Sequence, residues 1–431
     1  MRGSSPHALS LFSGIGGLCE GVCKAGFKIT GAVEKDSYAA ANYRLNFPHV
    51  PLYEGDITNF FPCSHPKLRS IHKAQYLGAN DLDLLFGGPP CQGFSSIGPR
   101  EVSDPRNQMF MEFCRIATFL RPKFILIENV PNMLLMNRGY FKERIFEALM
   151  EIGYENIGWN ILNAADYGVP QERRRVFIIA ARSGILKVSM QSIFNRAISL
   201  LTKPRISVEN AIGDLPKDVA PDSGHTIEYP DVSAKNYFQQ EMRLDSSGVI
   251  YNRSEKINRY KFSAESIELH NHHTKEIQNK RLRLVKLLKP GKKADSLPKH
   301  IWNRARPEKW RRFDPKRPAH TLMAQMHRDL SEWVHPFFDR WITVREALRL
   351  QSFHDGFILG GSEWQQLKQV GNAVPPLLGR ITSLVIRIGL WYVAKKNKAL
   401  DNFDCAIRDV FCHPKDFPRS VHFPKILSIK S

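Results

Sequence analysis

The sequence predicts an α/β fold in which a central sheet is covered by helices on both faces, and three observations support this. Up to about residue 185, short apolar runs alternate with segments of helical pattern. The apolar runs are nearly continuous, which is typical of parallel strands buried on both faces. Of the 431 residues, 42% are hydrophobic, including 26 Phe, 12 Tyr and 7 Trp, so the chain can bury a large core.

Strands and helices are expected to alternate along this first part of the chain. Strands are expected at His7–Phe12, Lys28–Val33, Asp83–Phe86, Phe124–Ile127 and Arg175–Ala180. Helices are expected between them at Leu18–Ala25, Ser37–Leu45, Gln108–Leu120 and Tyr140–Ile152. Sheets of this kind bind ligands in the crevice beyond the carboxyl ends of their strands. Most polar motifs of this chain directly follow an expected strand.

The alternation stops at about residue 186, and Pro, Asn, His, Lys and Arg become frequent up to about residue 335. Residues 271–320 hold sixteen Lys or Arg against four Asp or Glu, with Trp302 and Trp310 among them. This stretch carries more than half of the net charge of +20, so we interpret it as a nucleic-acid-binding domain rather than a solvated basic surface.

The remaining chain is expected to return to the first domain. Helices are expected at Thr343–Phe353 and Leu377–Ala394, with a turn at residues 370–376. The predicted organisation is therefore a first domain over 1–185, a second over 186–335, a return over 336–394 and a basic tail over 395–431 without an assigned role.

Composition and charge restrict the partners and the compartment. A net charge of +20 makes a polyanion the first partner to consider. The longest apolar stretch, Ile381–Ala394, is too short to span a membrane and contains Arg387, so no membrane partner is expected. The N-terminus lacks the apolar segment of a signal peptide, and the seven cysteines are irregularly spaced. We therefore expect a cytoplasmic protein with reduced thiols and no paired zinc site.

The first motif is Phe12-Ser-Gly-Ile-Gly-Gly17, between an expected strand and an expected helix. Glycines there allow a tight turn and the close approach of a ligand, although such a turn can also be purely structural. Glu34, about twenty residues on, could accept hydrogen bonds from a ribose, and Asp56 could accept from an exocyclic amine. Phe12 offers a flat face to an adenine-like ring. The set predicts a nucleoside-bearing ligand without pyrophosphate.

The second motif, Gly87-Gly-Pro-Pro-Cys-Gln-Gly-Phe-Ser95, follows the expected strand Asp83–Phe86. Two prolines stiffen the approach to Cys91, whose thiol is a candidate nucleophile in a rigid turn beyond a strand. The alternative, a buried and inert cysteine, fits Cys114 on its apolar helical face better than it fits Cys91.

Two further motifs supply an acid and cations. Glu128 directly follows the fourth expected strand, where partial burial can raise the pKa of its carboxyl and make it a proton donor. An ion pair with a neighbouring arginine is the alternative. In a strand, Gln171, Arg173 and Arg175 would share one face, so two guanidinium groups could point together into the cleft while Arg174 points away.

These motifs, in this order, resemble those of the C5-cytosine-specific DNA methyltransferase family of prokaryotic restriction–modification type. The matching segments are Phe12–Gly17, Glu34, Gly55–Asp56, Pro89–Gln92, Glu128–Val130, Gln171–Arg175, Thr343–Gln351 and Gly371–Pro375. The resemblance covers residues 8–185 and roughly 315–385, and the segment 186–315 lies where the family has its variable target-recognition region. It implies a Rossmann-like S-adenosylmethionine-dependent fold, with a mixed, mostly parallel sheet and a smaller irregular target-recognition domain.

The resemblance also implies the reaction, in which a methyl group passes from S-adenosyl-L-methionine to C5 of a specific cytosine in double-stranded DNA. Cys91 would add to C6 of a flipped-out base, and Glu128 would hold and protonate N3. Arg175 would contact the carbonyl oxygen at C2, with Arg173 near the thiolate or the backbone. The implied product is S-adenosyl-L-homocysteine, and no metal is expected.

Further site residues follow from the same resemblance. Those implied to bind the cofactor are Phe12, Ser13, Gly14, Gly16, Gly17, Glu34, Asp56, Ile57, Pro89, Asn372 and Val374. Those implied to contact DNA are Gln92, Ser95, Arg100 and Gln171.

Three alternatives are less favoured. A related lineage methylates cytosine in transfer RNA and carries a Cys-Phe-Thr segment in its recognition region, but this chain has no cysteine between Cys114 and Cys405. A catalytically silent DNA-binding relative would not need Cys91, Glu128 and Arg175. Methyltransferases that modify amino groups have an aromatic residue after Pro-Pro, where this chain has Cys91. We expect a compact, monomeric enzyme that protects host DNA from a partner restriction endonuclease.

Overall fold

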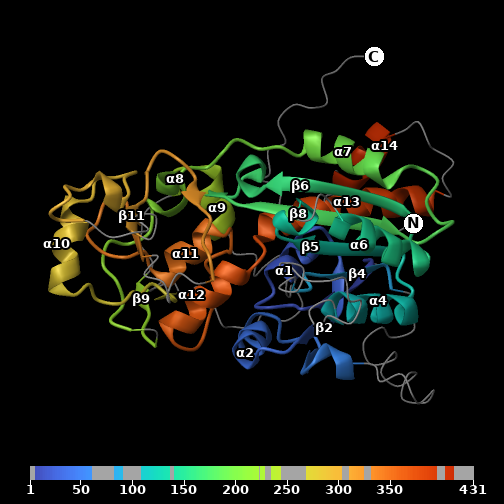
Figure 1. The fold of residues 1–431 in the computed structure, drawn as a ribbon, viewed down its shortest axis with the longest axis horizontal. Coiled ribbons are helices and arrows are strands. Elements are labelled where there is room, and N and C mark those ends of the chain that lie inside the picture. Colours follow the sequence, from blue (N-terminus) through green and yellow to red (C-terminus); the bar gives the residue numbers. More distant parts are fainter. Residues whose placement is uncertain are drawn as a thin grey trace.

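The structure of the protein is a computed structural model, shown in Figure 1. It describes residues 5–60, 82–90, 108–135, 140–222, 224–228, 234–243, 268–302, 310–324, 332–395 and 403–411. This part of the chain forms a large lobe around one sheet and a smaller lobe of short elements, at the right and left of Figure 1.

A seven-stranded sheet with the order β3-β2-β1-β4-β5-β8-β6 organises the large lobe. Its strands are β1 (His7–Leu11), β2 (Lys28–Glu34), β3 (Leu52–Glu54), β4 (Leu84–Gly87), β5 (Phe124–Asn129), β6 (Asn156–Asn163) and β8 (Arg174–Ala181). Neighbouring strands from β3 to β5 are parallel, whereas β8 runs antiparallel to both β5 and β6. The sheet is mixed and mostly parallel, so the predicted fold class is confirmed.

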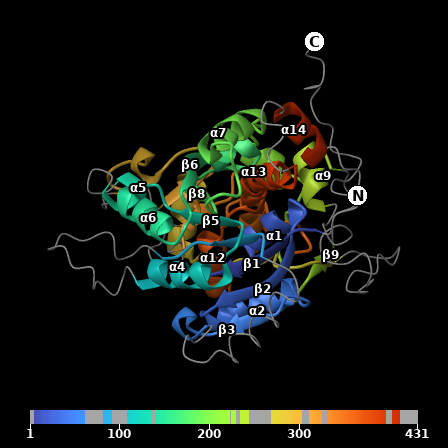
Figure 2. The ribbon, with the colours of Figure 1, turned by 90° about the vertical axis from the view of Figure 1, so that its right-hand side faces the viewer.

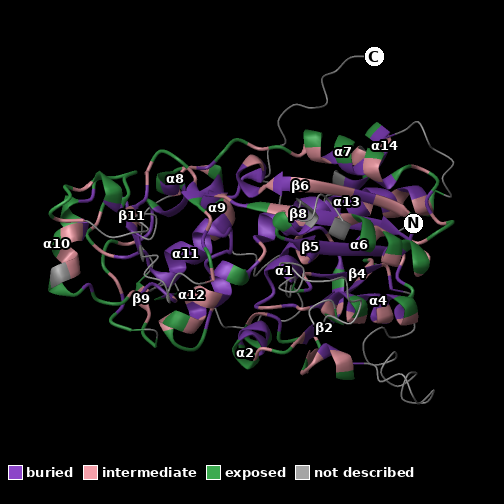
Figure 3. Cartoon of the chain, viewed as in Figure 1, coloured by how far each residue is buried: buried purple, intermediate pink, exposed green. Residues whose placement is uncertain are grey.

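Both faces of the sheet are buried, as the continuous apolar runs predicted. Successive side chains of a strand point to opposite faces, so Phe124 and Leu126 of β5 enter one core cluster while Ile125 and Ile127 enter the other. All six residues of β5 are buried. Figure 3 shows the same burial along the neighbouring strands in the middle of the sheet.

Helices cover the two faces of the sheet. Figure 2 shows α4 (Gln108–Leu120) and α6 (Tyr140–Glu151) on one side, and α1 (Gly17–Lys24) and α13 (Pro376–Ala394) on the other. Helix α2 (Ser37–Asn46) contributes side chains to the same cluster as α1. Helices α1 and α13 approach closely, because a Cβ atom on Gly21 would lie 2.5 Å from the carbonyl oxygen of Pro376.

Several element boundaries differ from the predictions. Strands β3 and β6 were not predicted, and only two of the eight residues of β6 are buried at the sheet edge, where polar side chains interrupt the apolar pattern. Helix α11 (Val344–Leu350) is shorter than expected, because Thr343 is its N-cap and Ser352 takes a φ of 64° just beyond its end. Helix α12 (Glu363–Asn372) extends into the predicted turn, and α14 (Phe403–Phe411) lies in the tail.

The smaller lobe consists of short helices and two-stranded pairings, as expected for an irregular domain. Its elements are α8 (Val208–Ile212), β9 (Ile227–Glu228), α9 (Tyr237–Arg243), β10 (Glu268–Leu269), α10 (Asn279–Leu287), β11 (Trp310–Arg312) and β13 (Glu332–Val334). Trp310 and Trp341 lie in its own apolar cluster. Helix α7 (Met190–Leu200) follows the boundary expected at residue 186 but packs against β6 of the large lobe.

A buried ion-pair network joins α11 to the segment that follows α8. The guanidinium group of Arg349, on α11, lies 2.8 Å from a carboxylate oxygen of Asp214 and 2.6 Å from one of Asp355. All three side chains are buried. Two carboxylates compensate the desolvated guanidinium, so removing one partner would leave an uncompensated buried charge.

One helical stretch of the described chain, Glu363–Ala394, has the length and apolar composition of a membrane-spanning helix. Its most apolar window is 67% buried inside the protein. A core helix of a globular protein has the same properties.

Candidate active site

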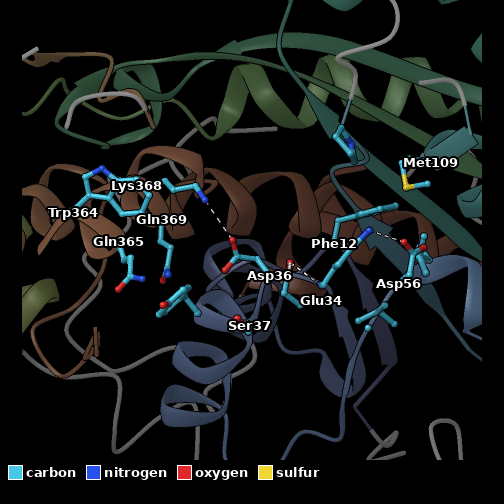
Figure 4. A pocket seen from close by; sticks show the side chains of 16 residues that line it. Phe12, Glu34, Asp36, Ser37, Asp56, Met109, Trp364, Gln365, Lys368 and Gln369 are labelled. Carbon is cyan, nitrogen blue, oxygen red and sulfur yellow. Dashed lines mark hydrogen bonds and ion pairs between the residues drawn. The ribbon is translucent and has the colours of Figure 1, made fainter. Parts of the chain in front are cut away.

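A cavity of about 660 Å³ opens beyond the carboxyl ends of β1, β2 and β3, where the sequence predicted a nucleoside site. Figure 4 shows Trp364 and Asp56 at opposite ends of this view, with Phe12, Glu34 and Asp36 between them. We call this cavity the cofactor pocket.

The turn between β1 and α1 forms one wall of the cofactor pocket. Phe12, Gly14 and Gly16 take φ angles of 54°, 55° and 96°, in the left-handed region that favours glycine. Gly17 is required for packing, because a Cβ atom there would lie 2.3 Å from the carbonyl oxygen of Val374. Of this turn, Phe12 lines the cavity, whereas Gly14, Gly16 and Gly17 give the turn its shape and packing without being part of the lining.

Glu34 ends β2 and is held by three backbone N–H groups. Gly14 donates to one carboxylate oxygen at 2.7 Å, and Lys35 and Asp36 donate to the other at 2.9 and 2.8 Å. A carboxylate has lone pairs for further donors, so Glu34 can still accept from ribose hydroxyls. The glycine turn and the predicted ribose acceptor are thus fixed to each other.

Asp56 presents an ionised carboxylate to the same cavity. The ammonium group of Lys35 donates to one of its oxygens at 2.7 Å, and the backbone of Thr58 donates to the other at 3.0 Å. These hydrogen bonds, that of Lys35 above all, lower the pKa of Asp56 to about 2. The acceptor proposed for an exocyclic amine is therefore charged across the physiological pH range.

The other residues implied to bind the cofactor are distributed over two cavities and the core. Ile57 lines the cofactor pocket, whereas Pro89 and Asn372 line a second cavity. Ser13 is buried, and its hydroxyl lies 2.8 Å from that of Ser10. Val374 contacts Gly17 through its carbonyl oxygen.

One wall of the cofactor pocket was not predicted. Helix α12 contributes Trp364, Gln365, Lys368 and Gln369, and Lys368 lies 3.4 Å from the carboxylate of Asp36. These side chains form two pairs at i, i+4 spacing, the mark of one helical face. This helical spacing was not used in the prediction, because residues 370–376 were interpreted as a turn and no helix was expected directly before them.

The second cavity, of about 260 Å³, contains the predicted acid and cation. Glu128, Arg173 and Arg175 line it, together with residues 321–324 of the smaller lobe. Pro90 lines both cavities, so they are adjacent. Cys91 directly follows Pro90 but lies outside the described residues, as do Gln92, Ser95 and Arg100. We call this cavity the base pocket.

Glu128 and Arg175 form an ion pair in the base pocket, with the Arg175 Nε 3.0 Å from a carboxylate oxygen. Burial raises the pKa of Glu128, while the positive charges of Arg175 and Arg173 act in the opposite direction. Both properties considered for Glu128, a raised pKa and an ion pair, therefore occur together. Gly88 permits this arrangement, because a Cβ atom there would lie 2.8 Å from the other carboxylate oxygen.

Arg173 does not join Arg175 in the ion pair with Glu128. It is fully buried and donates to the carbonyl oxygens of Leu322 at 2.9 Å, Gly371 at 2.9 Å and Ala373 at 3.0 Å. Arg174 is exposed, as predicted. The guanidinium group of Arg173 therefore fixes two backbone segments around the base pocket while its side chain forms part of the wall.

Gln171 is also fully buried, in the short strand β7 (Gln171–Glu172). Its amide donates to the carbonyl oxygen of Leu350 at 3.1 Å and accepts from the backbone of Leu322 at 3.0 Å. Both ends of the Gln171 side-chain amide are therefore bonded inside the protein, away from the surface at which a DNA contact was expected.

Within the described ranges, no group of three or more His, Cys, Asp or Glu side chains is arranged to hold a metal ion.

The carbonyl contacts of Arg173 lead to a stability prediction. Replacing Arg173 with Met leaves three buried carbonyl oxygens without their donor and should lower the free energy of unfolding by about 3 kcal/mol or more. Arg173→Lys, which keeps one charged donor group, should lie between Arg173→Met and the wild type. Chemical denaturation, monitored by circular dichroism, measures the free energy of unfolding of each variant.

The matched control is Arg174→Met at the adjacent exposed position, which should change the free energy of unfolding by less than about 0.5 kcal/mol. Equal effects of Arg173→Met and Arg174→Met would contradict the role given to Arg173.

Comparisons with known proteins agree with this geometry. Type II methyltransferase M.DdeI of Desulfomicrobium norvegicum is 34% identical over 413 residues, which span 92% of this chain and 91% of that protein. Type II methyltransferase M.AgeI of Thalassovita gelatinovora is 31% identical over 439 residues, which span 89% of this chain and 99% of that protein.

Solved structures are similar as well. The crystal structure of an E. coli prophage protein described as a DNA modification methyltransferase superposes with a TM-score of 0.70 at 27% identity, covering 91% of this chain and all of that one. The Dnmt2 methyltransferase of S. pombe, at 16% identity and a TM-score of 0.52 over 90% of this chain and 99% of that one, shares the fold alone. The model of the family described as C-5 cytosine-specific DNA methylase matches residues 7–386. The chain belongs to the C-5 cytosine-specific DNA methylases.

Proposed function

We propose that the protein transfers a methyl group from S-adenosyl-L-methionine to C5 of a specific cytosine in double-stranded DNA, through a covalent adduct between Cys91 and C6 of a flipped-out base. The observation that carries this proposal is the Glu128–Arg175 pair in a base pocket that shares Pro90 with the cofactor pocket. Family membership supports DNA cytosine methylation, and the Type II relatives support a role in restriction–modification.

The chemistry requires three groups around one pyrimidine ring. C5 of cytosine is a poor nucleophile, so the Cys91 thiolate first adds to C6 and makes C5 enamine-like. Glu128, whose pKa is raised by burial, gives a proton to N3 as the Cys91 sulfur bonds to C6. Arg175 holds the carbonyl oxygen at C2. C5 takes the methyl group, and S-adenosyl-L-homocysteine is the leaving group. The C5 proton then goes to a base, the thiolate is eliminated from C6 and the N3 proton returns to Glu128, which restores the aromatic ring, Cys91 and the protonated carboxyl.

The residues of the cofactor pocket fit an adenosine-bearing ligand. Phe12 offers its ring to the adenine, Asp56 accepts from the exocyclic amine, and Glu34 accepts from the ribose hydroxyls. The bound cofactor supplies an electrophilic methyl group on a sulfonium. The remaining side chains of the pocket exclude water and orient the ligand toward Pro90 and the base pocket.

Duplex DNA hides the target ring within the base stack, so the enzyme must extrude the nucleotide, at a cost of roughly a few kcal/mol. The basic smaller lobe supplies phosphate contacts, and base contacts from its side chains select the site. We also propose that the enzyme acts as a monomer in the cytoplasm and protects host DNA from a partner restriction endonuclease.

The decisive experiment measures transfer of tritiated methyl groups from labelled S-adenosylmethionine to duplex DNA and, separately, to transfer RNA. Bisulfite sequencing of DNA from expressing cells then identifies the modified site. Label in duplex DNA at C5 of cytosine supports the proposal, whereas label in transfer RNA alone would overturn it.

Cys91→Ser should bind the identified duplex with wild-type affinity and transfer no measurable methyl label, because the hydroxyl is a far weaker nucleophile than a thiolate. Duplexes with 5-fluorocytosine at the site should become covalently attached to the wild-type enzyme when S-adenosylmethionine is present, as denaturing electrophoresis reports. Cys114→Ser, at a buried cysteine on α4, is the control and should keep both properties. Residual transfer by Cys91→Ser would remove Cys91 from its role.

Asp56→Ala removes a charged acceptor from the cofactor pocket. It should weaken binding of S-adenosylhomocysteine by about ten- to a hundredfold, the usual worth of a hydrogen bond to a charged group. Isothermal titration calorimetry measures the dissociation constant. Glu54→Ala, on β3 but outside the pocket, should leave this constant unchanged.

The raised pKa of Glu128 predicts the sign of a pH effect. The protonated carboxyl is the active form, so kcat/KM should fall as the pH rises through the pKa of Glu128, above the range of an exposed glutamate. Glu128→Gln should lower kcat/KM by about 10²–10⁴-fold and abolish this decline. A pH–rate profile measures both, with the surface variant Glu147→Gln as the control. If kcat/KM of Glu128→Gln still fell with rising pH as in the wild type, the decline would belong to another titrating group.

A further inference from the structure

Two large apolar side chains are exposed at the wall of the base pocket. Met323 is 52% exposed and Val130 is 44% exposed, and both line the cavity that contains Glu128 and Arg175. They come from different parts of the fold, Val130 directly after β5 and Met323 from residues 321–324 of the smaller lobe. Exposed apolar side chains gathered at a cavity are typical of a binding surface.

The backbone beside Met323 is fixed to the large lobe. Strand β12 (Ala319–His320) pairs with β7, and the hydroxyl of Thr321 donates to the carbonyl oxygen of Glu172 at 2.6 Å. The backbone of Leu322 is then held at both its N–H and its carbonyl group, by Gln171 and Arg173.

The backbone of Met323 and Ala324 also packs closely against Gly371 of α12. A Cβ atom on Gly371 would lie 2.4 Å from the backbone nitrogen of Ala324 and from the carbonyl carbon of Met323. Met323 is therefore an exposed apolar residue that lines the base pocket and belongs to a tightly anchored backbone segment.

We propose that Met323 packs against the face of the extruded pyrimidine and holds it in the base pocket. This inference rests on the proposed function. Glu128 and Arg175 can recognise the polar edge of the ring, but a flat ring also presents apolar faces that hydrogen bonds do not cover. The unbranched, polarisable thioether of methionine adapts well to an aromatic face.

The test compares two duplexes that differ only at the target nucleotide. One carries cytosine at the site found by bisulfite sequencing, and the other carries an abasic residue there. With S-adenosylhomocysteine present, Met323→Ala should weaken binding of the cytosine duplex about tenfold, from the loss of a buried apolar contact. It should leave the affinity for the abasic duplex unchanged, because no ring is then present to contact.

Two further variants complete the design. Met323→Leu keeps an apolar side chain of similar volume and should stay within about threefold of wild type, because volume-conserving apolar exchanges cost little. Met150→Ala, at an exposed methionine on α6 outside both cavities, should not change either affinity.

Three outcomes would overturn the proposal for Met323. The first is an unchanged affinity of Met323→Ala for the cytosine duplex. The second is an equal loss of affinity for both duplexes, which would indicate a purely structural role. The third is an affinity of Met323→Leu for the cytosine duplex as low as that of Met323→Ala. Failure of the proposed function is separate, because the wild type itself would then transfer no methyl group to duplex DNA.

Discussion

Arg173 donates hydrogen bonds to carbonyl groups from two parts of the chain that lie about 150 and 200 residues further on. One part contains Leu322, just after β12, and the other contains Gly371 and Ala373, at the C-terminal end of α12. Desolvating a guanidinium is costly, so the group occupies this position only while both segments surround it. The base pocket exists because its walls share this one cation.

The proposed chemistry depends on how charge is divided between two adjacent cavities. Asp56 is held ionised in the cofactor pocket by the ammonium of Lys35, whereas burial raises the pKa of Glu128 in the base pocket. Two carboxyl groups on neighbouring parts of one sheet edge are thereby suited to opposite tasks, one to accept hydrogen bonds and the other to give up a proton. Among the residues that the structure describes, only Pro90 is common to the walls of both cavities.

Much of this arrangement could be predicted from the sequence, because it depends on local order along the chain. Continuous apolar runs located five of the seven strands, and polar residues directly after them located Glu34 and Glu128. The position of Arg174 followed from strand alternation. These features need only the geometry of a strand and the rule that ligands bind beyond its carboxyl end.

The remaining features depend on distant contacts that leave no pattern in the sequence. The partners of Arg173 and Gln171 are backbone carbonyl and amide groups, which every residue possesses, so no residue type marks them. Strand β6 lies at the sheet edge with only two of its eight residues buried. Its polar side chains break the continuous apolar run by which the other strands were predicted. The helical face of α12 was hidden by a glycine and prolines that indicated a turn.

The three consecutive arginines have different environments: Arg173 is buried, Arg174 is exposed, and Arg175 contacts Glu128. A shift of one residue in the pairing of β8 would exchange these environments, because side chains alternate across a strand. The rest of β8 is apolar on both faces, so hydrophobicity hardly distinguishes the two alignments. The register of β8 therefore decides which guanidinium group faces Glu128, since a slip of one residue would present the wrong one while the motif still read Arg-Arg-Arg.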